Sequence, residues 1–331
     1  MSELGNTRLI GSELSRLSNP DEADISCGFL RVQSVNQALL EASMQPNPKQ
    51  LFLSLWNEGE LCCLFADSNL GKSVLSVQIC SAIAETGKRV LLFDFEMSSK
   101  MFSMRYSDDS TGELHKFPDN FYRAELSSEL MAEAKADNFE KALMQYIEAS
   151  IIRTKCEVIA IDNLSWMCSA SEQGADAGLL MIELMRLKRQ YHLSVLVVSH
   201  TPKRGLGEPL TQNSLAGSKR LFNFFDSCFA LGRSAKDSNI LYLKQLKVRT
   251  SAFEYGADNV ILYHLDKVDG FLQFILDGFG CEEDHLRTYS EADRASMIEE
   301  AKRLSGQGMS QRAIASQLGI SVGAVNKYLN R

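Results

Sequence analysis

A short segment of this chain has the residue types and spacing that bind phosphate groups. Residues 66–73 read Ala-Asp-Ser-Asn-Leu-Gly-Lys-Ser, directly after an apolar run at 61–65. In loops of this pattern, successive backbone N–H groups point inward around phosphate oxygens at the start of a helix. We therefore expect nucleotide phosphates to be bound by Ala66, Asp67, Ser68, Asn69, Leu70, Gly71, Lys72 and Ser73.

Three positions of this loop have distinct expected roles. Gly71 allows the backbone to approach the phosphates closely, Lys72 reaches the β- and γ-phosphates, and the Ser73 hydroxyl ligates Mg²⁺. Ala66 replaces the glycine of the strict pattern, and a small residue still fits there. The predicted ligands are therefore ATP and Mg²⁺.

Carboxylates follow two apolar runs farther along the chain. Residues 158–162 end in Asp162, and residues 90–94 end in Asp94 with Glu96 close behind. Transfer of a phosphoryl group to water needs a carboxylate that positions the metal and a base for the attacking water. Open α/β sheets build such sites at the carboxyl ends of their strands. We expect Asp162 to hold Mg²⁺ together with Ser73, and a carboxylate after the second run to lie near the water.

The surrounding pattern predicts the elements that position these groups. Short apolar runs predict buried strands at 61–65, 89–95, 158–162 and 194–199. Helical stretches at 72–86 and 178–192 lie between them, and this alternation indicates a parallel α/β sheet. After residue 227, strand-like runs at 240–248, 259–265 and 270–276 follow without long helices between them. These runs predict an antiparallel extension of the sheet.

The order of these motifs resembles the RecA-like ATPases of the AAA family. The phosphate loop is followed by Phe-Glu-Met-Ser at 95–98, Ile-Asp-Asn at 161–163 and Val-Val-Ser-His at 197–200. Within the RecA-like proteins, the chain is most similar to the DnaB- and RepA-type hexameric helicases. The resemblance covers residues 50 to 265, and it implies a P-loop NTPase core that assembles into a homo-oligomer, with a hexamer as the expected form.

The resemblance also implies roles for individual residues. Glu96 would be the catalytic base, with Arg105 at the matching position nine residues later, and His200 would be the polar sensor. Lys247 and Arg249 would reach the γ-phosphate of a neighbouring subunit. Loops after the core strands would line a central channel and grip single-stranded DNA, which makes Lys203 and Arg204 candidates for phosphate contacts.

Each of these assignments has a structural alternative. His200 ends an apolar strand and could be a histidine whose hydrogen bonds only support the fold. Lys247 and Arg249 could form the exposed face of an edge strand. Lys203 and Arg204 lie in a Gly-rich loop, where basic side chains are often simply solvated.

The last part of the chain predicts a small helical domain. A helical stretch at 291–304 is followed by Ser-Gly-Gln-Gly, and two short helices follow with Ser310 and Ser321 as caps and Gly319 in the turn. This pattern resembles the helix-turn-helix of resolvase and invertase C-terminal domains. Its expected inward side chains are Ile314, Ala315, Leu318, Ile320, Val325 and Leu329.

A helix-turn-helix of this kind would place its second helix in the major groove of duplex DNA. Residues 310–331 contain Arg312, Lys327 and Arg331 and no acidic residue, whereas the whole chain has a net charge of −7. The expected DNA contacts are Arg312, Ser321, Val322, Gly323, Asn326 and Lys327. A helical hairpin used for oligomerisation is the alternative.

Composition sets the remaining limits. With 45% hydrophobic and 23% charged residues, the chain is an ordinary globular protein rather than a disordered one. No run of about 18 apolar residues occurs, so no membrane partner is expected. The eight cysteines contain no C-x-x-C pair and fit free thiols of a reducing cytoplasm.

These features predict four segments and one function. Residues 1–50 form a polar N-terminal segment, 51–280 a RecA-like ATPase domain, 281–290 a charged linker, and 291–331 the helix-turn-helix. The predicted protein is an ATP-dependent DNA motor, such as a helicase or a replication or mobilisation ATPase of a plasmid or mobile element. The alternative is an ATP-gated regulator that binds duplex DNA through the helix-turn-helix without unwinding it.

Overall fold

The computed structural model describes most of the chain, and it divides the chain into two compact units. The described residues are 25–27, 30–126, 139–163, 176–201, 205, 207–215, 219–287, 291–318, 320 and 322–330. The first unit spans Met1–Pro48 and the second spans Lys49–Arg331. Each unit is described by itself.

The first unit contains regular structure that the sequence analysis did not predict. Strands β1 (Ile25–Cys27) and β2 (Leu30–Val32) pair antiparallel, and helix α2 (Val35–Ser43) follows them. The Ser34 hydroxyl caps this helix by accepting a hydrogen bond from the Gln37 N–H at 3.1 Å. The apolar side chains of α2 are exposed and scattered among polar ones, which is why no core-forming periodicity was recognised there.

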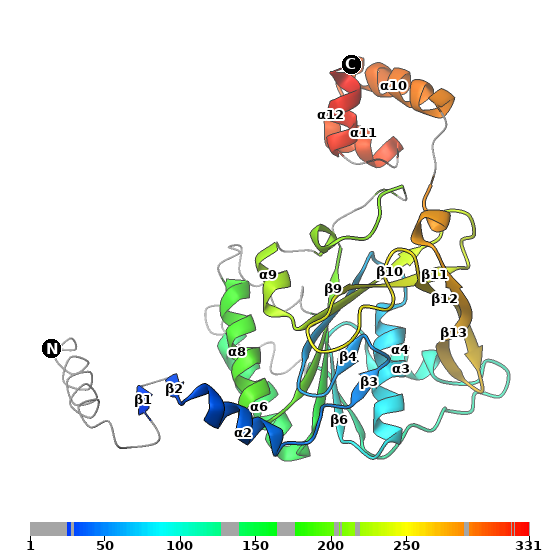
Figure 1. Cartoon of the computed structure of the whole chain (residues 1–331). Coiled ribbons are helices and arrows are strands. Elements are labelled where there is room, and N and C mark those ends of the chain that lie inside the picture. Colours follow the sequence, from blue (N-terminus) through cyan, green and yellow to red (C-terminus); the bar gives the residue numbers. More distant parts are fainter. Residues whose placement is uncertain are drawn as a thin grey trace. The chain divides into compact units, whose positions relative to one another are not determined.

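The second unit is built around a nine-stranded sheet (Figure 1). The strand order is β13-β12-β11-β10-β5-β9-β8-β6-β7. The strands are β5 (Leu61–Ala66), β6 (Val90–Asp94), β7 (Phe121–Ala124), β8 (Val158–Asp162), β9 (Ser194–His200), β10 (Ser227–Arg233), β11 (Leu241–Lys247), β12 (Val260–Val268) and β13 (Phe271–Gly280). A separate small hairpin joins β3 (Gln50–Phe52) to β4 (Trp56–Asn57).

The pairing of these strands confirms the predicted fold class. From β10 to β7 all neighbours run parallel, and β10, β11, β12 and β13 pair antiparallel. Strand β9 lies between β5, which precedes the phosphate loop, and β8, which ends in Asp162. The molecule therefore has the mixed α/β sheet of a RecA-like core, with the expected antiparallel extension.

Helices cover both faces of this sheet (Figure 1). The helices are α3 (Lys72–Glu85), α4 (Ser99–Arg105), α6 (Phe139–Thr154), α8 (Asp176–Gln190) and α9 (Lys219–Phe224). Alternate residues of β5 enter different cores, because successive strand side chains point to opposite faces. Leu61 and Phe65 pack with α6, α8 and α9, whereas Cys62 and Leu64 pack with α3. Burial on both faces explains why the central strands are nearly continuous apolar runs.

Helices α10 (Glu291–Gly306), α11 (Gln311–Leu318) and α12 (Val322–Leu329) form a small group with a core of its own. Ser310 caps α11 by accepting a hydrogen bond from the Ala313 N–H at 3.3 Å. The predicted turn residue Gly319 and the predicted cap Ser321 lie outside the described residues. The core of this group consists of Ala301, Leu304, Ile314, Ala315 and Val325, with Leu318, Ile320 and Leu329 packed against it.

Two further observations bear on the sequence predictions. Five cysteines are buried free thiols, namely Cys62, Cys63, Cys80, Cys156 and Cys228. Among the described residues, no helix is both long enough and apolar enough to span a membrane.

Candidate functional site

The phosphate loop connects the end of β5 to the start of α3. Gly71, the last residue before the helix, has φ of 80°, a left-handed conformation that glycine adopts without strain. A Cβ atom at this position would also lie 3.0 Å from the Phe274 ring and 3.2 Å from Leu265. Glycine is therefore required here both for its backbone conformation and for space.

Neighbouring strands hold this loop in place. The Thr201 N–H, just past β9, donates to the Ala66 carbonyl at 3.0 Å, and the Thr201 hydroxyl donates to the Asp67 carboxylate. On the other side, Arg233 at the end of β10 donates to the Asn69 carbonyl at 3.3 Å. The loop is thus fixed by the two strands that flank β5.

The Lys72 side chain contacts the backbone of the phosphate loop. Its side chain is buried, and its Nζ donates to the carbonyls of Ala66 at 3.0 Å and Asp67 at 2.8 Å. Burial lowers the pKa of this ammonium group, while the nearby charges of Asp162 and Glu96 oppose that shift. A lysine held this way places its positive charge where phosphates of a bound nucleotide would lie.

Asp162 is buried at the end of β8, and it accepts a hydrogen bond from Ser73. Burial raises the pKa of its carboxyl group to about 7, while the Ser73 hydrogen bond and the Lys72 charge lower it. A cation next to this carboxylate would favour its ionised form. Hydroxyl and carboxylate oxygens are the ligands that Mg²⁺ prefers, and Mg²⁺ is commonly held by one or two protein ligands plus substrate phosphates. Ser73 and Asp162 fit that role.

Three side chains meet beside this pair, each from the end of a different strand. Asn163 follows β8 directly, and its amide Nδ2 donates to the Glu96 carboxylate and lies 3.1 Å from His200 Nε2. His200 Nε2 in turn lies 3.4 Å from Glu96 Oε1. The Glu96 side chain is 42% exposed, so water can reach its carboxylate. Sequence reasoning placed Glu96 and His200 here but missed Asn163, although its position next to Asp162 was a usable signal.

Asp94 has a different task from Glu96. Its Oδ1 accepts the N–H groups of Glu96 at 3.2 Å and Met97 at 2.9 Å, and its Oδ2 pairs with Arg123 Nε at 2.9 Å. The Asp94 side chain is only 1% exposed. Its oxygens are therefore occupied in shaping the turn that carries Glu96, which leaves Glu96 as the carboxylate available to water. Arg123, on edge strand β7, was not recognised from the sequence.

Lys247 and Arg249 lie near the beginning of the parallel strands, whereas the phosphate loop lies at their carboxyl ends. Strand β11 runs antiparallel to β10, and Lys247 pairs with Cys228 near the beginning of β10, whereas the loop follows the end of the parallel strand β5. A strand of this length spans roughly 15–20 Å. The structure therefore does not bring these two residues to the phosphate loop of their own chain. Arg105, the other basic residue singled out, ends α4.

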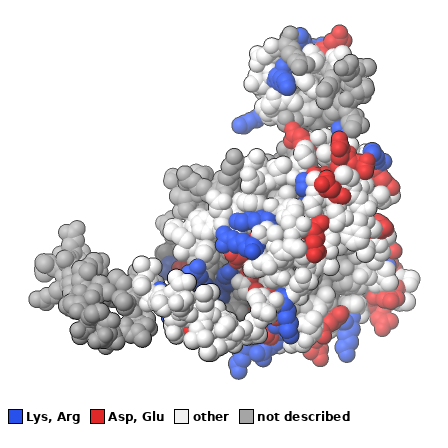
Figure 2. All heavy atoms as spheres, in the orientation of Figure 1, with Lys and Arg blue, Asp and Glu red and all other residues white. Residues whose placement is uncertain are grey.

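The predicted DNA contacts are placed only in part. Lys203, Arg204 and Ser321 lie outside the described residues. Arg312, Val322, Gly323, Asn326 and Lys327 are exposed on α11 and α12. The face shown in Figure 2 carries both acidic and basic side chains of described residues, so charge on this face does not by itself mark a DNA path.

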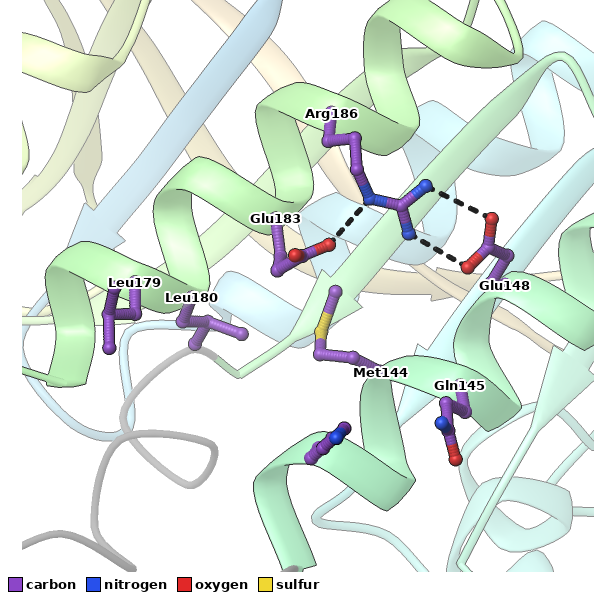
Figure 3. Close-up of a pocket in the computed structure, with 8 residues that line it drawn as sticks. Met144, Gln145, Glu148, Leu179, Leu180, Glu183 and Arg186 are labelled. Carbon is purple, nitrogen blue, oxygen red and sulfur yellow. Dashed lines mark hydrogen bonds and ion pairs between the residues drawn. The ribbon is translucent and has the colours of Figure 1, made fainter. Parts of the chain in front are cut away.

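A groove between α6 and α8 is separate from this site (Figure 3). It has a volume of about 410 Å³, and no residue of the phosphate loop or of the Glu96 cluster lines it. Arg186 crosses one end, with its Nη2 2.8 Å from Glu148 on α6 and its Nε 2.7 Å from Glu183 on its own helix (Figure 3). The ion pair with Glu148 joins α8 to α6 on the face of the sheet opposite α3.

A family model matches the part of the chain that holds this site. Residues 29–205 match the family described as AAA domain. None of the curated proteins compared matches the chain. Among solved structures, a KaiC-like protein from the hyperthermophilic archaeon Pyrococcus horikoshii OT3 is similar at 12% sequence identity and a TM-score of 0.46, over 66% of this chain and 91% of that chain.

The family match spans more than half of the chain. It includes the phosphate loop and the three strand ends that carry Glu96, Asp162 and His200. The chain belongs to the AAA domain family, and its second unit is a P-loop ATPase with a RecA-like fold.

Proposed function

We propose that this protein is an ATP-driven DNA motor of the RepA and DnaB type, which hydrolyses ATP between subunits of a homo-oligomeric ring. The observation that carries the proposal is that some residues assigned to the reaction meet in one place, whereas two others lie far from them. Lys72, Ser73, Asp162, Asn163, Glu96 and His200 meet within one chain. Lys247 and Arg249, which the resemblance assigns to the same reaction, lie at the opposite ends of the strands from the phosphate loop, so we assign them to the site of a neighbouring subunit.

The chemistry assigned to each group follows from its position. Glu96 accepts the proton of the attacking water, while Asn163 holds the Glu96 carboxylate and the His200 ring in one cluster. Lys72 stabilises negative charge on the β- and γ-phosphates. Ser73 and Asp162 would hold Mg²⁺, which would supply further positive charge to the same phosphates.

The proposed link to DNA depends on the residues that follow strand β9. His200 lies 3.4 Å from Glu96, and Lys203 and Arg204 follow it three and four residues later in the chain. The proposal connects a change at the nucleotide through this strand end to two basic residues that it assigns to DNA phosphates. The exposed positions of α12 provide a second surface, suited to duplex DNA when several copies act together.

A strand-displacement assay on forked DNA tests this function, together with the mass of the protein in solution with and without ATP. The motor predicts ATP-dependent displacement by an oligomer, and loss of displacement when Glu96 is replaced with glutamine. ATP-dependent binding of duplex DNA without displacement would instead identify an ATP-gated regulator.

A further inference from the structure

We propose that Asp226 and Glu60 are positioning residues that hold Arg249 ready to act on the nucleotide of a neighbouring subunit. This inference rests on the trans role of Arg249 proposed above. It concerns two acidic residues that lie far from the phosphate loop and take no part in the site just described.

The Arg249 side chain is anchored at two of its nitrogen atoms. Nη1 lies 3.1 Å from Asp226 Oδ1, and Nη2 donates to the Asn223 carbonyl at 3.4 Å. The side chain is still 54% exposed. Both terminal nitrogens of the guanidinium group are therefore held by the protein, while about half of the side chain stays exposed.

Asp226 is itself held rigidly. Its Oδ2 accepts the Leu61 N–H at 2.9 Å and pairs with Lys188 Nζ on α8 at 2.7 Å. Although burial opposes ionisation, the hydrogen bonds of Leu61 and Lys188 and the nearby charges hold the pKa of this carboxyl group below its usual value. A charged and immobile carboxylate is a suitable anchor for a long cationic side chain.

Glu60 holds the backbone that carries Arg249. This carboxylate is buried and accepts hydrogen bonds from the Thr250 hydroxyl, from the Ser227 hydroxyl at 2.9 Å and from the Asn57 N–H at 3.0 Å. The side-chain amide of Asn57 donates to Thr250 Oγ1 at 3.0 Å and to the Ser251 hydroxyl at 2.5 Å. These hydrogen bonds therefore hold the two residues after Arg249 at the same end of the strands as Asp226.

Such anchoring matters because arginine is long and flexible. A catalytic group displaced by about 1 Å can cost on the order of 100-fold in rate. We therefore expect Asp226→Asn and Thr250→Val each to lower ATP hydrolysis by about 10-fold or more, with ATP affinity nearly unchanged. Arg186→Gln, on the same helix as Lys188, is the control, since it removes ion pairs with Glu148 and Glu183 that touch neither Asp226 nor Arg249, and it should retain hydrolysis.

A mixing experiment distinguishes positioning from a general loss of fold. Glu96→Gln subunits lack the base but keep Arg249, whereas Arg249→Ala subunits keep the base. Each variant alone should be inactive. In an equal mixture, about a quarter of the interfaces would join an intact base to an intact Arg249, so hydrolysis should recover to about that fraction.

Asp226→Asn and Thr250→Val should behave as Arg249→Ala does in these mixtures. Each should regain activity when mixed with Glu96→Gln, and neither should regain it when mixed with Arg249→Ala. If Glu96→Gln and Arg249→Ala do not complement each other, the trans role of Arg249 is wrong. If they do, but Asp226→Asn is fully active alone or also complements Arg249→Ala, the positioning role of Asp226 is overturned.

Discussion

Replacing Glu96 with glutamine isolates the one property that the proposed mechanism needs from this side chain. Glutamine has the same length, and its Oε1 can still accept the hydrogen bond that Asn163 donates to Glu96. What disappears is the ability to take a proton from water. Loss of a general base costs about 100-fold or more in rate, which corresponds to about 2.7 kcal/mol of activation free energy.

The assay compares turnover with binding. Phosphate release should fall by about 100-fold or more in Glu96→Gln, while the affinity for a fluorescent ATP analogue should remain close to that of the native protein. Because hydrolysis is blocked after binding, the variant should also accumulate the ATP-bound oligomer, which its mass in solution would show.

Asp94→Asn should behave differently from Glu96→Gln, because the Asp94 carboxylate supports the fold. The change leaves Arg123 without its buried partner and weakens the turn before Met97. Breaking a buried ion pair in this way costs roughly 3 kcal/mol of the free energy of unfolding. For a domain of this size, that cost lowers Tm by about 6–12 °C.

The two variants should therefore fail in opposite ways, with Glu96→Gln stable but inactive and Asp94→Asn less stable but active where folded. Normal turnover in Glu96→Gln would refute the assignment of the base. A stable and inactive Asp94→Asn protein would show that the wrong carboxylate was chosen.

Three further predictions concern the phosphate loop and the domain boundary. Lys72→Ala should abolish hydrolysis and weaken nucleotide binding while the chain still folds, because its buried ammonium group supports phosphates rather than packing; unchanged ATPase activity would contradict this. Burial raises the pKa of Asp162 from 3.8 to about 7, so this group destabilises the nucleotide-free and Mg²⁺-free protein progressively as the pH rises between these two values, and the full penalty is reached above pH 7. Asp162→Asn should raise Tm at pH 8 and raise it less at pH 6, and an equal gain at both pH values would argue against a buried charge. A chain truncated after Arg287 should keep ATPase activity and lose the salt-sensitive binding of duplex DNA, whereas equal duplex binding by both chains would make the C-terminal helices an assembly element.

Much of the core could be predicted because its strands are buried on both faces. Runs such as 61–65, 158–162 and 194–199 contain almost only apolar residues, and each ends where a polar group must reach the edge of the sheet. The loop pattern and these strand ends predicted that Lys72, Asp162 and a carboxylate after 90–94 lie in one site. The role of Glu96 as the base and the place of His200 came from the family resemblance.

Other parts depend on contacts that local sequence does not show. Edge strand β7 has only four residues, and its side chains are partly exposed, so no apolar run marks it. Its register places Arg123 beside Leu92 of β6, within reach of Asp94, although 29 residues separate the ion pair in the chain. The distinction between Asp94 and Glu96 follows from that pairing and could not be read from the motif.

Contacts between residues distant in the sequence are also important in the charged segment 281–290. The sequence analysis interprets it as a charged linker, yet Glu282 is 2% exposed and lies 2.5 Å from Lys244 on β11. The other Glu282 oxygen accepts the Leu210 N–H at 2.7 Å, and Lys244 donates to the Leu210 carbonyl at 2.9 Å. Both backbone groups of Leu210 are therefore satisfied by one buried ion pair.

This ion pair joins two parts of the chain that the proposed function assigns to DNA. Leu210 follows the segment that contains Lys203 and Arg204, and Glu282 precedes the C-terminal helices. Removing either charged partner leaves the other buried and uncompensated, at a cost of several kcal/mol. Truncation after Cys281 would thus damage the ATPase domain itself, whereas truncation after Arg287 keeps the ion pair. A loss of activity in the shorter chain alone would therefore reflect Glu282 and not the missing helices.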